Sequence, residues 1–226
     1  MIRTDPKPKV NSKGCDTIAW PVRSTLTFPM PSELPNRNFF ETVISRRSHR
    51  SLARAPFKPV CEAIGWTLSP RAIMTGDSFQ RHRSTILSPG ALHAVSVILV
   101  SWKGRTGRAF KFSPFTFSLE QLAIQHPDHL TELSQEIKNV LPCASDLAIC
   151  FVGDQKKIGA LYDYPESLLW REAGAALQGL SLTLWALGII SCPVGITCAS
   201  FISALGLPSS DAIPLGGMAI GLPTES

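Results

Sequence analysis

The sequence predicts an α+β fold in which a mixed or antiparallel sheet is surrounded by helices. Apolar, β-branched segments at 94–102, 146–152 and 213–220 have the composition of buried strands. Helical periodicity lies between them, most clearly over 128–137 and 166–190. The two kinds of segment do not alternate in the regular strand–helix rhythm of a parallel sheet, which favours α+β over α/β.

The first third of the chain predicts an arm followed by short helices. Residues 1–34 are rich in Pro, Lys, Ser and Thr and are expected to form an extended or disordered N-terminal arm before a single domain at 35–226. Asn36 or Asn38 can cap a helix over 39–44. A second short helix is expected at 60–68, and an irregular loop follows at 69–89.

The remaining elements follow from periodicity and capping signals. Ser118 to Gln121 has the capping-box pattern, which predicts that a helix begins there. Gly216-Gly217 indicates a bulge or a close backbone approach in the last strand. We expect strands at 94–102, 146–152 and 213–220, an aromatic strand or hairpin at 110–117 broken at Pro114, and helices beginning at Ser118 and Asp128 and spanning 166–190 and 201–205.

The segment 173–192 is apolar and long enough to cross a membrane. Gln178, Ser181 and Thr183 interrupt it, and Arg171-Glu172 precede it. We therefore interpret it as a core helix buried on all sides rather than as a membrane span. Hydrophobic residues make up 44% of the chain and charged residues 17%, which favours burial of part of its surface in a subunit interface.

Composition also narrows the class of partner. The net charge of +5 suits an anionic ligand, but the basic residues are scattered and no nucleic-acid-binding motif is present. The six cysteines form no Cys-x-x-Cys pair and have no usual metal-ligand spacing, so we expect reduced thiols, no metal site and a cytoplasmic protein. No apolar run follows the first basic residues, so no secretory signal is expected.

The stretch Arg46-Arg47-Ser48-His49-Arg50 is the strongest candidate for a binding site. If its backbone is extended, Arg46, Ser48 and Arg50 share one face. Guanidinium groups form charge-assisted hydrogen bonds with phosphate oxygens. No glycine-rich phosphate-binding loop of the usual kinds is present, so side chains would hold a phosphate here. A solvated basic turn is the alternative.

Two further segments could approach a flat ligand. Cys192-Pro193-Val194-Gly195 follows the long helix and could turn sharply and expose backbone N–H groups. An ordinary helix-ending turn is the alternative. Ser88-Pro89-Gly90-Ala91-Leu92-His93 is a loop of mostly small residues before a predicted strand, where a ligand could come close to the backbone. A simple strand-entry turn is the alternative.

Together these motifs resemble the nitroreductase family of FMN enzymes over about residues 38 to 223. They are Arg-Arg-Ser-x-Arg, the small-residue loop, a long helix followed by Cys-Pro-x-Gly, and the closing Leu-Gly-Leu-Pro, strand and Gly-x-Pro. The 88–93 loop is similar to that of the thiazoline/oxazoline dehydrogenase branch, which oxidises azoline rings in ribosomal peptides and related natural products.

The resemblance implies FMN as cofactor and a homodimer whose core is the long central helix. Arg46, Ser48 and Arg50, with Arg47 nearby, would hold the FMN phosphate and ribityl chain. Ser88, Gly90 and His93 would approach the flavin from the other subunit. Pro193, Val194 and Gly195 would lie against its central ring. The branch often has a Lys-Tyr pair before the long helix, and the nearest catalytic candidates here are Lys157, Tyr162 and Tyr164, which are not adjacent.

Three functions remain open at this point. The first is an FMN-dependent dehydrogenase that transfers hydride between a heterocyclic or peptide-derived natural product and flavin N5. The second is an NAD(P)H-dependent reductase of nitro compounds, quinones or flavins. The third is a flavin-free scaffold subunit of the same fold, which is favoured by the absence of a basic residue after the last strand. No nucleic-acid or membrane partner is expected in any of them.

Overall fold

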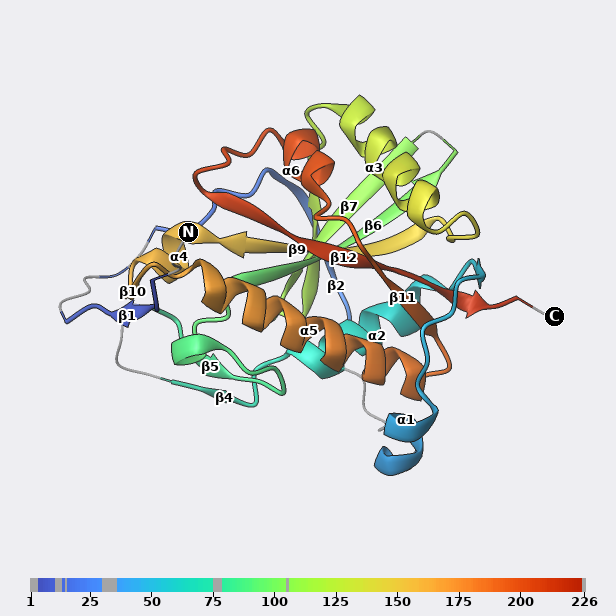
Figure 1. Cartoon of the computed structure of the whole chain (residues 1–226), viewed down its shortest axis with the longest axis horizontal. Helices are drawn as coiled ribbons and strands as arrows, with labels where there is room; N and C mark the ends of the chain where they lie inside the picture. The colour runs from blue at the N-terminus through green and yellow to red at the C-terminus, as the bar shows by residue number, and fades with distance from the viewer. Residues whose placement is uncertain are drawn as a thin grey trace.

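A computed structural model describes residues 4–10, 14, 16–29, 36–74, 79–104 and 106–224 of the chain. Its centre is an antiparallel sheet with helices against both faces (Figure 1), which confirms the α+β class. The strand order is β11-β12-β9-β6-β7-β8-β2, and β3 pairs with the end of β12. The strands of this sheet are β2 (Val22–Thr27), β3 (Leu52–Ala53), β6 (Val95–Lys103), β7 (Thr106–Ser113), β8 (Ser118–Leu122), β9 (Leu147–Asp154), β11 (Ile190–Val194) and β12 (Ala212–Pro223).

Helices and two small strand pairs surround the sheet. One small pair joins the N-terminal arm to the segment before the long helix, and the other lies within the predicted irregular loop. The pairs are β1 (Lys7–Pro8) with β10 (Tyr162–Asp163), and β4 (Ala72–Ile73) with β5 (His82–Arg83). The helices are α1 (Phe39–Ser45), α2 (Phe57–Leu68), the 3-10 turn η1 (Pro89–Ala91), α3 (Pro127–Val140), α4 (Gln155–Gly159), α5 (Glu166–Ala186) and α6 (Ala199–Leu205).

Strands β6 and β9 lie in the middle of the sheet and are apolar along nearly their whole length because both of their faces are covered. Successive side chains point to opposite faces. Leu99 and Ile149 pack in the cluster that includes α2 and α5, whereas Ile98 and Cys150 pack in the cluster that includes α3 and α6. These two helix pairs lie on opposite sides of the sheet (Figure 1).

Most predicted helices are confirmed, with small shifts at their ends. Asn38 caps α1, because its side-chain oxygen accepts a hydrogen bond from the N–H of Phe40 at 2.8 Å. Helix α2 begins at Phe57, three residues before the predicted start. Helix α3 begins at Pro127 rather than Asp128, as proline favours the first helical position.

The predicted helix at Ser118 is wrong, because Ser118–Leu122 forms strand β8. It pairs with β7 on one side and β2 on the other, and Leu119 and Leu122 are buried in the core. The Ser118 hydroxyl bonds to that of Thr116 rather than capping a helix. Pairing on two sides thus outweighs a local capping signal.

The long helix ends four residues before its predicted end, and Ile190–Val194 forms strand β11. A Schellman motif terminates the helix: Gly188 has φ of 76°, its N–H donates to Trp185 O, and the Ile189 N–H donates to Leu184 O. Pro193 therefore lies in an edge strand rather than in a sharp turn, and its missing N–H is tolerated at an edge.

The bulge predicted at Gly216-Gly217 is confirmed. The register of β12 against β9 shifts between Pro214 and Gly217, and Gly216 has φ of 95°. A Cβ atom on Gly217 would lie 2.4 Å from the carbonyl oxygen of Ile149, so the two backbones approach too closely for any side chain.

Helix α5 is not buried on all sides within one chain. Its inner face packs on α2 and the sheet, but Trp170, Gly174 and Gln178, which share one face, are exposed. In the part of the chain that the structure describes, no helix has the length and apolar character needed to cross a membrane.

The described part of the N-terminal arm is extended and joins the body of the molecule at two places. Strand β2 forms one edge of the sheet beside β8, and β1 pairs with β10. Between them the N–H of Ile18 donates to the carboxylate of Asp154 at 2.9 Å. Ile18 itself is buried, so this part of the arm is packed against the domain.

Candidate functional site

The arginine segment lies against the outer edge of the sheet. Helix α1 ends at Ser45, and the backbone continues extended from Arg46, with φ of −57° and ψ of 125°. Ser48 forms a parallel bridge with Ser191 of β11, and the His49 N–H donates to Ser191 O at 3.3 Å. Two of the predicted cofactor-binding segments, 46–50 and 193–195, are therefore brought together within one chain.

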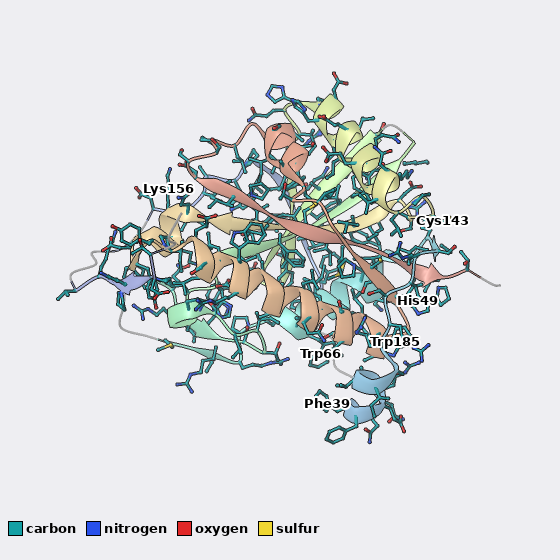
Figure 2. The ribbon with its side chains drawn as sticks, in the orientation of Figure 1. Phe39, His49, Trp66, Cys143, Lys156 and Trp185 are labelled. Carbon is teal, nitrogen blue, oxygen red and sulfur yellow. The ribbon has the colours of Figure 1, made fainter. Side chains whose placement is uncertain are left out.

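Trp185 at the end of α5 holds this segment in place (Figure 2). The imidazole of His49 stacks on its indole ring, with 5.5 Å between ring centroids. The indole N–H donates to Ser45 Oγ at 2.8 Å, and Arg37 donates to the Trp185 carbonyl at 3.2 Å. His49 is half-buried, whereas the neighbouring Arg47 and Arg50 are exposed.

The donors of this segment suit a phosphate group. Arg46, Arg47 and Arg50 form no ion pair or side-chain hydrogen bond with any residue that the structure describes. Arg50 lies close enough to Cys192 to oppose the effect of burial, which raises the pKa of that thiol. A Cβ atom on Gly195 would meet no atom within 4 Å, so the space beside it is open to a flat ring. These residues therefore fit the phosphate and ring of FMN.

The end of β12 lies beside the same segment. Leu222 and Pro223 pair with Ala53 and Leu52, and the Thr224 hydroxyl donates to Ser51 Oγ at 3.0 Å. The chain thus places a neutral hydroxyl, rather than a lysine or arginine, next to the arginine segment.

The other predicted residues gather at the opposite end of α5. The Lys157 ammonium donates to the His93 carbonyl at 3.2 Å. A Cβ atom on Gly90 would lie 3.1 Å from the Tyr162 hydroxyl. The structure therefore brings Lys157 and Tyr162 next to the 88–93 loop. Tyr164 is exposed and is not among the residues that line the cavity described next.

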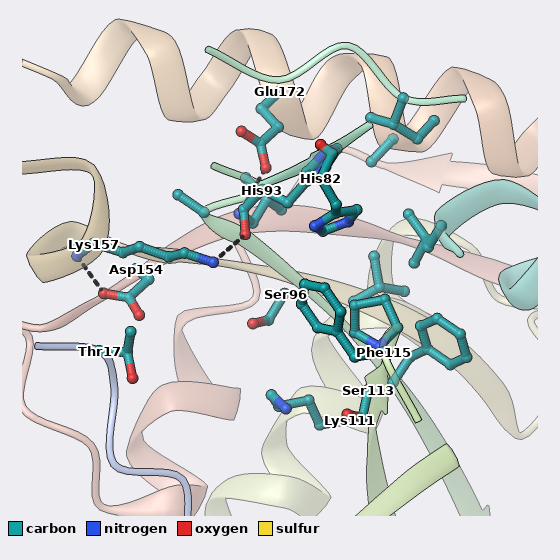
Figure 3. Close-up of a pocket in the computed structure, with 18 of the residues that line it drawn as sticks. Thr17, His82, His93, Ser96, Lys111, Ser113, Phe115, Asp154, Lys157 and Glu172 are labelled. Carbon is teal, nitrogen blue, oxygen red and sulfur yellow. Dashed lines mark hydrogen bonds between the residues drawn. The ribbon is translucent and has the colours of Figure 1, made fainter. Parts of the chain in front are cut away.

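A cavity of about 260 Å³ opens between this loop, the ends of β6 and β7, and the N-terminal arm (Figure 3). Lys157 and His93 line it, but most of its wall was not predicted from the sequence. The unpredicted residues include Trp20, His82, Ser96, Phe115, Asp154 and Glu172. Glu172 carried one available signal, because it is the acidic residue directly before an apolar helical segment.

Glu172 ties the loop to α5. Its carboxylate is 2% exposed and accepts hydrogen bonds from the Ser88 hydroxyl at 2.7 Å and the Val95 N–H at 2.8 Å. The Ser88 oxygen in turn accepts from the His93 N–H at 2.8 Å. Burial raises the pKa of the Glu172 carboxyl, and these hydrogen bonds oppose that effect.

The loop also has unusual backbone geometry. Gly90, Ala91 and His93 all have positive φ, at 59°, 55° and 49°. Glycine adopts such angles easily, but alanine and histidine do so at a cost. Conformations of this kind are concentrated at ligand-binding sites, where the surrounding structure enforces them.

Two imidazoles stack at the inner end of the cavity. The rings of His82 and His93 are 3.9 Å apart, and His93 Nε2 bonds to the His82 carbonyl at 2.9 Å. Burial, with added repulsion from His93 and Lys157, lowers the pKa of His82 to about 4. Burial also lowers the pKa of His93. His82 is therefore neutral at pH 7.

This buried imidazole predicts a loss of stability in acid. Between the usual pKa of 6.5 and the folded value of about 4, the unfolded chain binds a proton that the folded chain does not. The free energy of unfolding should therefore fall by about 3 kcal/mol as the pH drops through this range. Urea unfolding at pH 7 and pH 4 measures the fall. The fall in the free energy of unfolding should be smaller in His82→Phe than in the wild type, and it should be unchanged in the surface variant His129→Gln. Equal falls in the wild type and both variants would exclude His82 as the cause.

The two groups of residues do not meet within one chain. Glu172 lies near the start of α5 and Trp185 near its end, about 20 Å apart along the helix. The arginine segment is at the end of α5 and the cavity is at its start. That the two groups belong to one site shared between two chains, as the resemblance implies, stays a prediction.

Comparisons with known proteins identify the fold. No protein-family model and no curated protein matches the chain. A solved structure from Ralstonia eutropha JMP134 that carries the name nitroreductase is 14% identical, with a TM-score of 0.66, covering 99% of this chain and 100% of that one. A nitroreductase-named structure from Desulfovibrio desulfuricans in complex with FMN is 17% identical, with a TM-score of 0.53 over 84% and 88% of the chains.

A third similar structure is a chain of the Escherichia coli microcin synthetase McbBCD complex with truncated pro-MccB17 bound. It is 15% identical to this chain, with a TM-score of 0.58, covering 90% of this chain and 79% of that one. Likeness at these identities shows the fold, which is nitroreductase-like as the sequence resemblance implied. The thiazoline/oxazoline dehydrogenase branch remains a prediction.

Proposed function

We propose that this chain is an FMN-dependent oxidoreductase whose phosphate site is formed by Arg46, Arg47, Ser48 and Arg50. The observation that carries the proposal is the position of this segment. Its arginines have no carboxylate partner among the described residues, and its backbone bridges to the edge strand that carries Pro193, Val194 and Gly195. Unpaired arginines at such a place suit a dianionic phosphate.

The flat part of the cofactor would lie beside Pro193, Val194 and Gly195, next to the place where the arginine segment meets β11 and where the space beside Gly195 is open. Bound flavin would supply hydride transfer at its N5 atom. The chain's own residues would fix the position of the cofactor and the substrate. Preorganised backbone donors next to the ring would favour the reduced, electron-rich form.

A homodimer would complete the site. In a two-fold dimer built on α5, the start of one helix faces the end of the other, so Ser88, Gly90 and His93 of one chain would approach the arginine segment of its partner. The exposed face of α5 supports this arrangement, because Gly174 has open space around it and Trp170 and Gln178 flank it. The apolar residues of α1, also exposed, would be covered by the same contact.

Lys157, Tyr162 and Tyr164 are the proposed proton-transferring groups, and of these Lys157 lines the cavity. Lys157 reaches the cavity, and its ammonium is held by the His93 carbonyl. A proton lost from substrate when hydride leaves for the flavin would need an acceptor within hydrogen-bond reach, which would be the neutral amine of Lys157 or the phenolate of Tyr162 and not the ammonium form. The likeness to the McbBCD chain and the 88–93 loop support a heterocyclic or peptide-derived substrate, oxidised by this route.

An NAD(P)H-dependent reductase is the second candidate, favoured by the nitroreductase names of similar structures. Rapid bleaching of the flavin by NAD(P)H would support this candidate, and its absence would support the dehydrogenase. A protein that is colourless as isolated and binds no added FMN would instead support a flavin-free scaffold.

The five described cysteines are free thiols, which fits the proposed cytoplasmic location.

Removing one arginine tests the phosphate site. Arg46→Ala and Arg50→Ala should each weaken FMN binding by about 1.5–3 kcal/mol, or about ten- to a hundredfold, because each deletes a charge-assisted contact. Quenching of flavin fluorescence on titration with the apoprotein measures the dissociation constant. Arg108→Ala, on the exposed side of β7, is the matched control and should bind FMN normally. Unchanged affinity in both site variants would refute the assignment.

A further inference from the structure

Few contacts attach helix α1 and the arginine segment to the rest of the molecule. All seven residues of α1 are described, and of these only Thr42 is buried. A helix of this length is not stable by itself in water. The arginines that follow it form no ion pair or side-chain hydrogen bond with any described residue. Their position therefore depends on the residues that flank them.

Trp185 of α5 contacts the chain on both sides of Arg46 and Arg47 (Figure 2). Before these two arginines, the indole N–H donates to Ser45 Oγ at 2.8 Å. After them, the imidazole of His49 stacks on the indole with an interplanar angle of 24°. One side chain thus holds both ends of the stretch that carries two of the guanidinium groups.

The stack also sets the direction of the neighbouring side chains. The His49 ring is turned inward, and its Nε2 atom is buried. Successive side chains of an extended backbone point to opposite sides, so an inward His49 turns Ser48 and Arg50 outward. Both of these residues are exposed. Without the stack, Trp185 would no longer restrain rotation of the segment about its own backbone.

Trp185 is itself fixed in the fold. It lies in the last turn of α5 and packs, partly buried, against the cluster that includes α3 and α6. Its carbonyl oxygen accepts hydrogen bonds from the Arg37 side chain at 3.2 Å and from the Gly188 N–H at 3.0 Å. The end of a long helix is therefore a rigid support for the segment beside it. A preorganised receptor binds more tightly than a mobile one, because fewer side chains have to be ordered on binding.

We propose that Trp185 is a positioning residue of the phosphate site, which holds the arginine segment in its binding arrangement before a phosphate arrives. It acts through Ser45 and His49 rather than by contact with the phosphate. The inference rests on the proposed function, because the phosphate in question is that of FMN. It deepens that function, since it makes recognition of the phosphate depend on the end of α5.

A comparison of FMN with riboflavin, the same flavin without the phosphate, tests the inference. Trp185→Leu removes the indole N–H and the stacking face together. It should weaken FMN binding about tenfold and leave riboflavin binding within about twofold of the wild-type value. Trp185→Phe keeps a ring for His49 but lacks the donor, so its loss should be smaller. Quenching of flavin fluorescence on titration with the full-length apoprotein gives each dissociation constant.

Trp66→Leu is the matched control. Trp66 is also half-buried, but it lies on α2, where the guanidinium group of Arg71 is 5.6 Å from the centre of its ring (Figure 2). The same substitution there should leave the affinity for both flavins unchanged. Thermal unfolding of every variant establishes that binding is measured on folded protein.

Hydrogen exchange of the backbone amides of residues 46–50 gives a second readout that requires no flavin. Exchange should be faster in Trp185→Leu than in the wild type or Trp66→Leu. The reason is that the hydrogen bond from the His49 N–H to the Ser191 carbonyl opens more often when the segment is no longer held. Unchanged exchange in Trp185→Leu would overturn the positioning role.

The two flavins separate a failure of this inference from a failure of the phosphate site. If Trp185→Leu keeps the wild-type preference for FMN over riboflavin, or loses both flavins equally, the inference is wrong and the phosphate site stands. If the wild type binds FMN no more tightly than riboflavin, the phosphate site is wrong and the inference falls with it. Should Trp185→Leu fail to fold, the same comparison in Trp185→Phe decides.

Discussion

Replacing Glu172 by alanine should lower the free energy of unfolding by about 4 kcal/mol, because two largely buried donors lose their acceptor at once. These donors are the Ser88 hydroxyl and the Val95 N–H. The same change releases the 88–93 loop from α5, so the positive-φ conformation of Ala91 and His93 loses one of its supports. Urea unfolding of the variant, followed by far-UV circular dichroism, measures the effect.

Glu172→Gln is the matched control for this variant. It keeps the shape of the side chain and one carbonyl oxygen, and it cannot ionise in a site that raises the pKa of the carboxyl. We expect a smaller loss, about 1–2 kcal/mol, because one of the two donors would face an amide N–H₂ instead of an oxygen. A loss below about 1 kcal/mol in Glu172→Ala would show that the Ser88 and Val95 donors find other acceptors.

Gly217→Ala should destabilise the protein by about 3 kcal/mol or more. The new methyl group would lie 2.4 Å from the Ile149 carbonyl oxygen and 3.1 Å from Cys198 Sγ. A flexible side chain could move away, but the carbonyl belongs to β9 in the middle of the sheet. The β12–β9 pairing must therefore open, and β11, which pairs with β12, would shift with it.

Gly159→Ala serves as the control for Gly217→Ala. A methyl group there would meet no atom within 4 Å, and Gly159 lies at the end of α4 rather than in a strand. The free energy of unfolding of the Gly159→Ala variant should differ from that of the wild type by less than about 0.5 kcal/mol. Thermal unfolding of both variants gives the comparison. Similar melting temperatures for the two would mean that β12 can move to accept a side chain at position 217.

The elements that the sequence predicted correctly are those with signals along their whole length. Strand β9 is apolar throughout, and α3 repeats Leu130, Leu133 and Ile137 on one face. Both patterns reflect burial, which periodicity records directly. Errors came from short local signals. Ser118-x-x-Gln121 matches a capping box, but neighbours distant in the sequence make it a strand.

The site was partly predictable for a similar reason. Arg46, Ser48 and Arg50 could be singled out because their spacing itself suggests a phosphate receptor, and the pairing of Ser48 with Ser191 explains how they meet β11. His82 and Asp154 could not be found in this way. His82 lies in the two-residue strand β5, inside a segment that the sequence predicts as an irregular loop, and Asp154 meets the N-terminal arm through Ile18 only in the folded chain. Their relevance depends on contacts between parts of the chain far apart in the sequence.

The bridge between Ser48 and Ser191 has a consequence for the handling of this protein. An uncovered outer strand can recruit strands from other molecules and start aggregation. Here the stretch rich in guanidinium groups shields the margin of the sheet at β11 and surrounds it with positive charge. Changes that loosen this stretch should therefore lower solubility, separately from any effect on the proposed binding of FMN, and light scattering should accompany every titration of such variants.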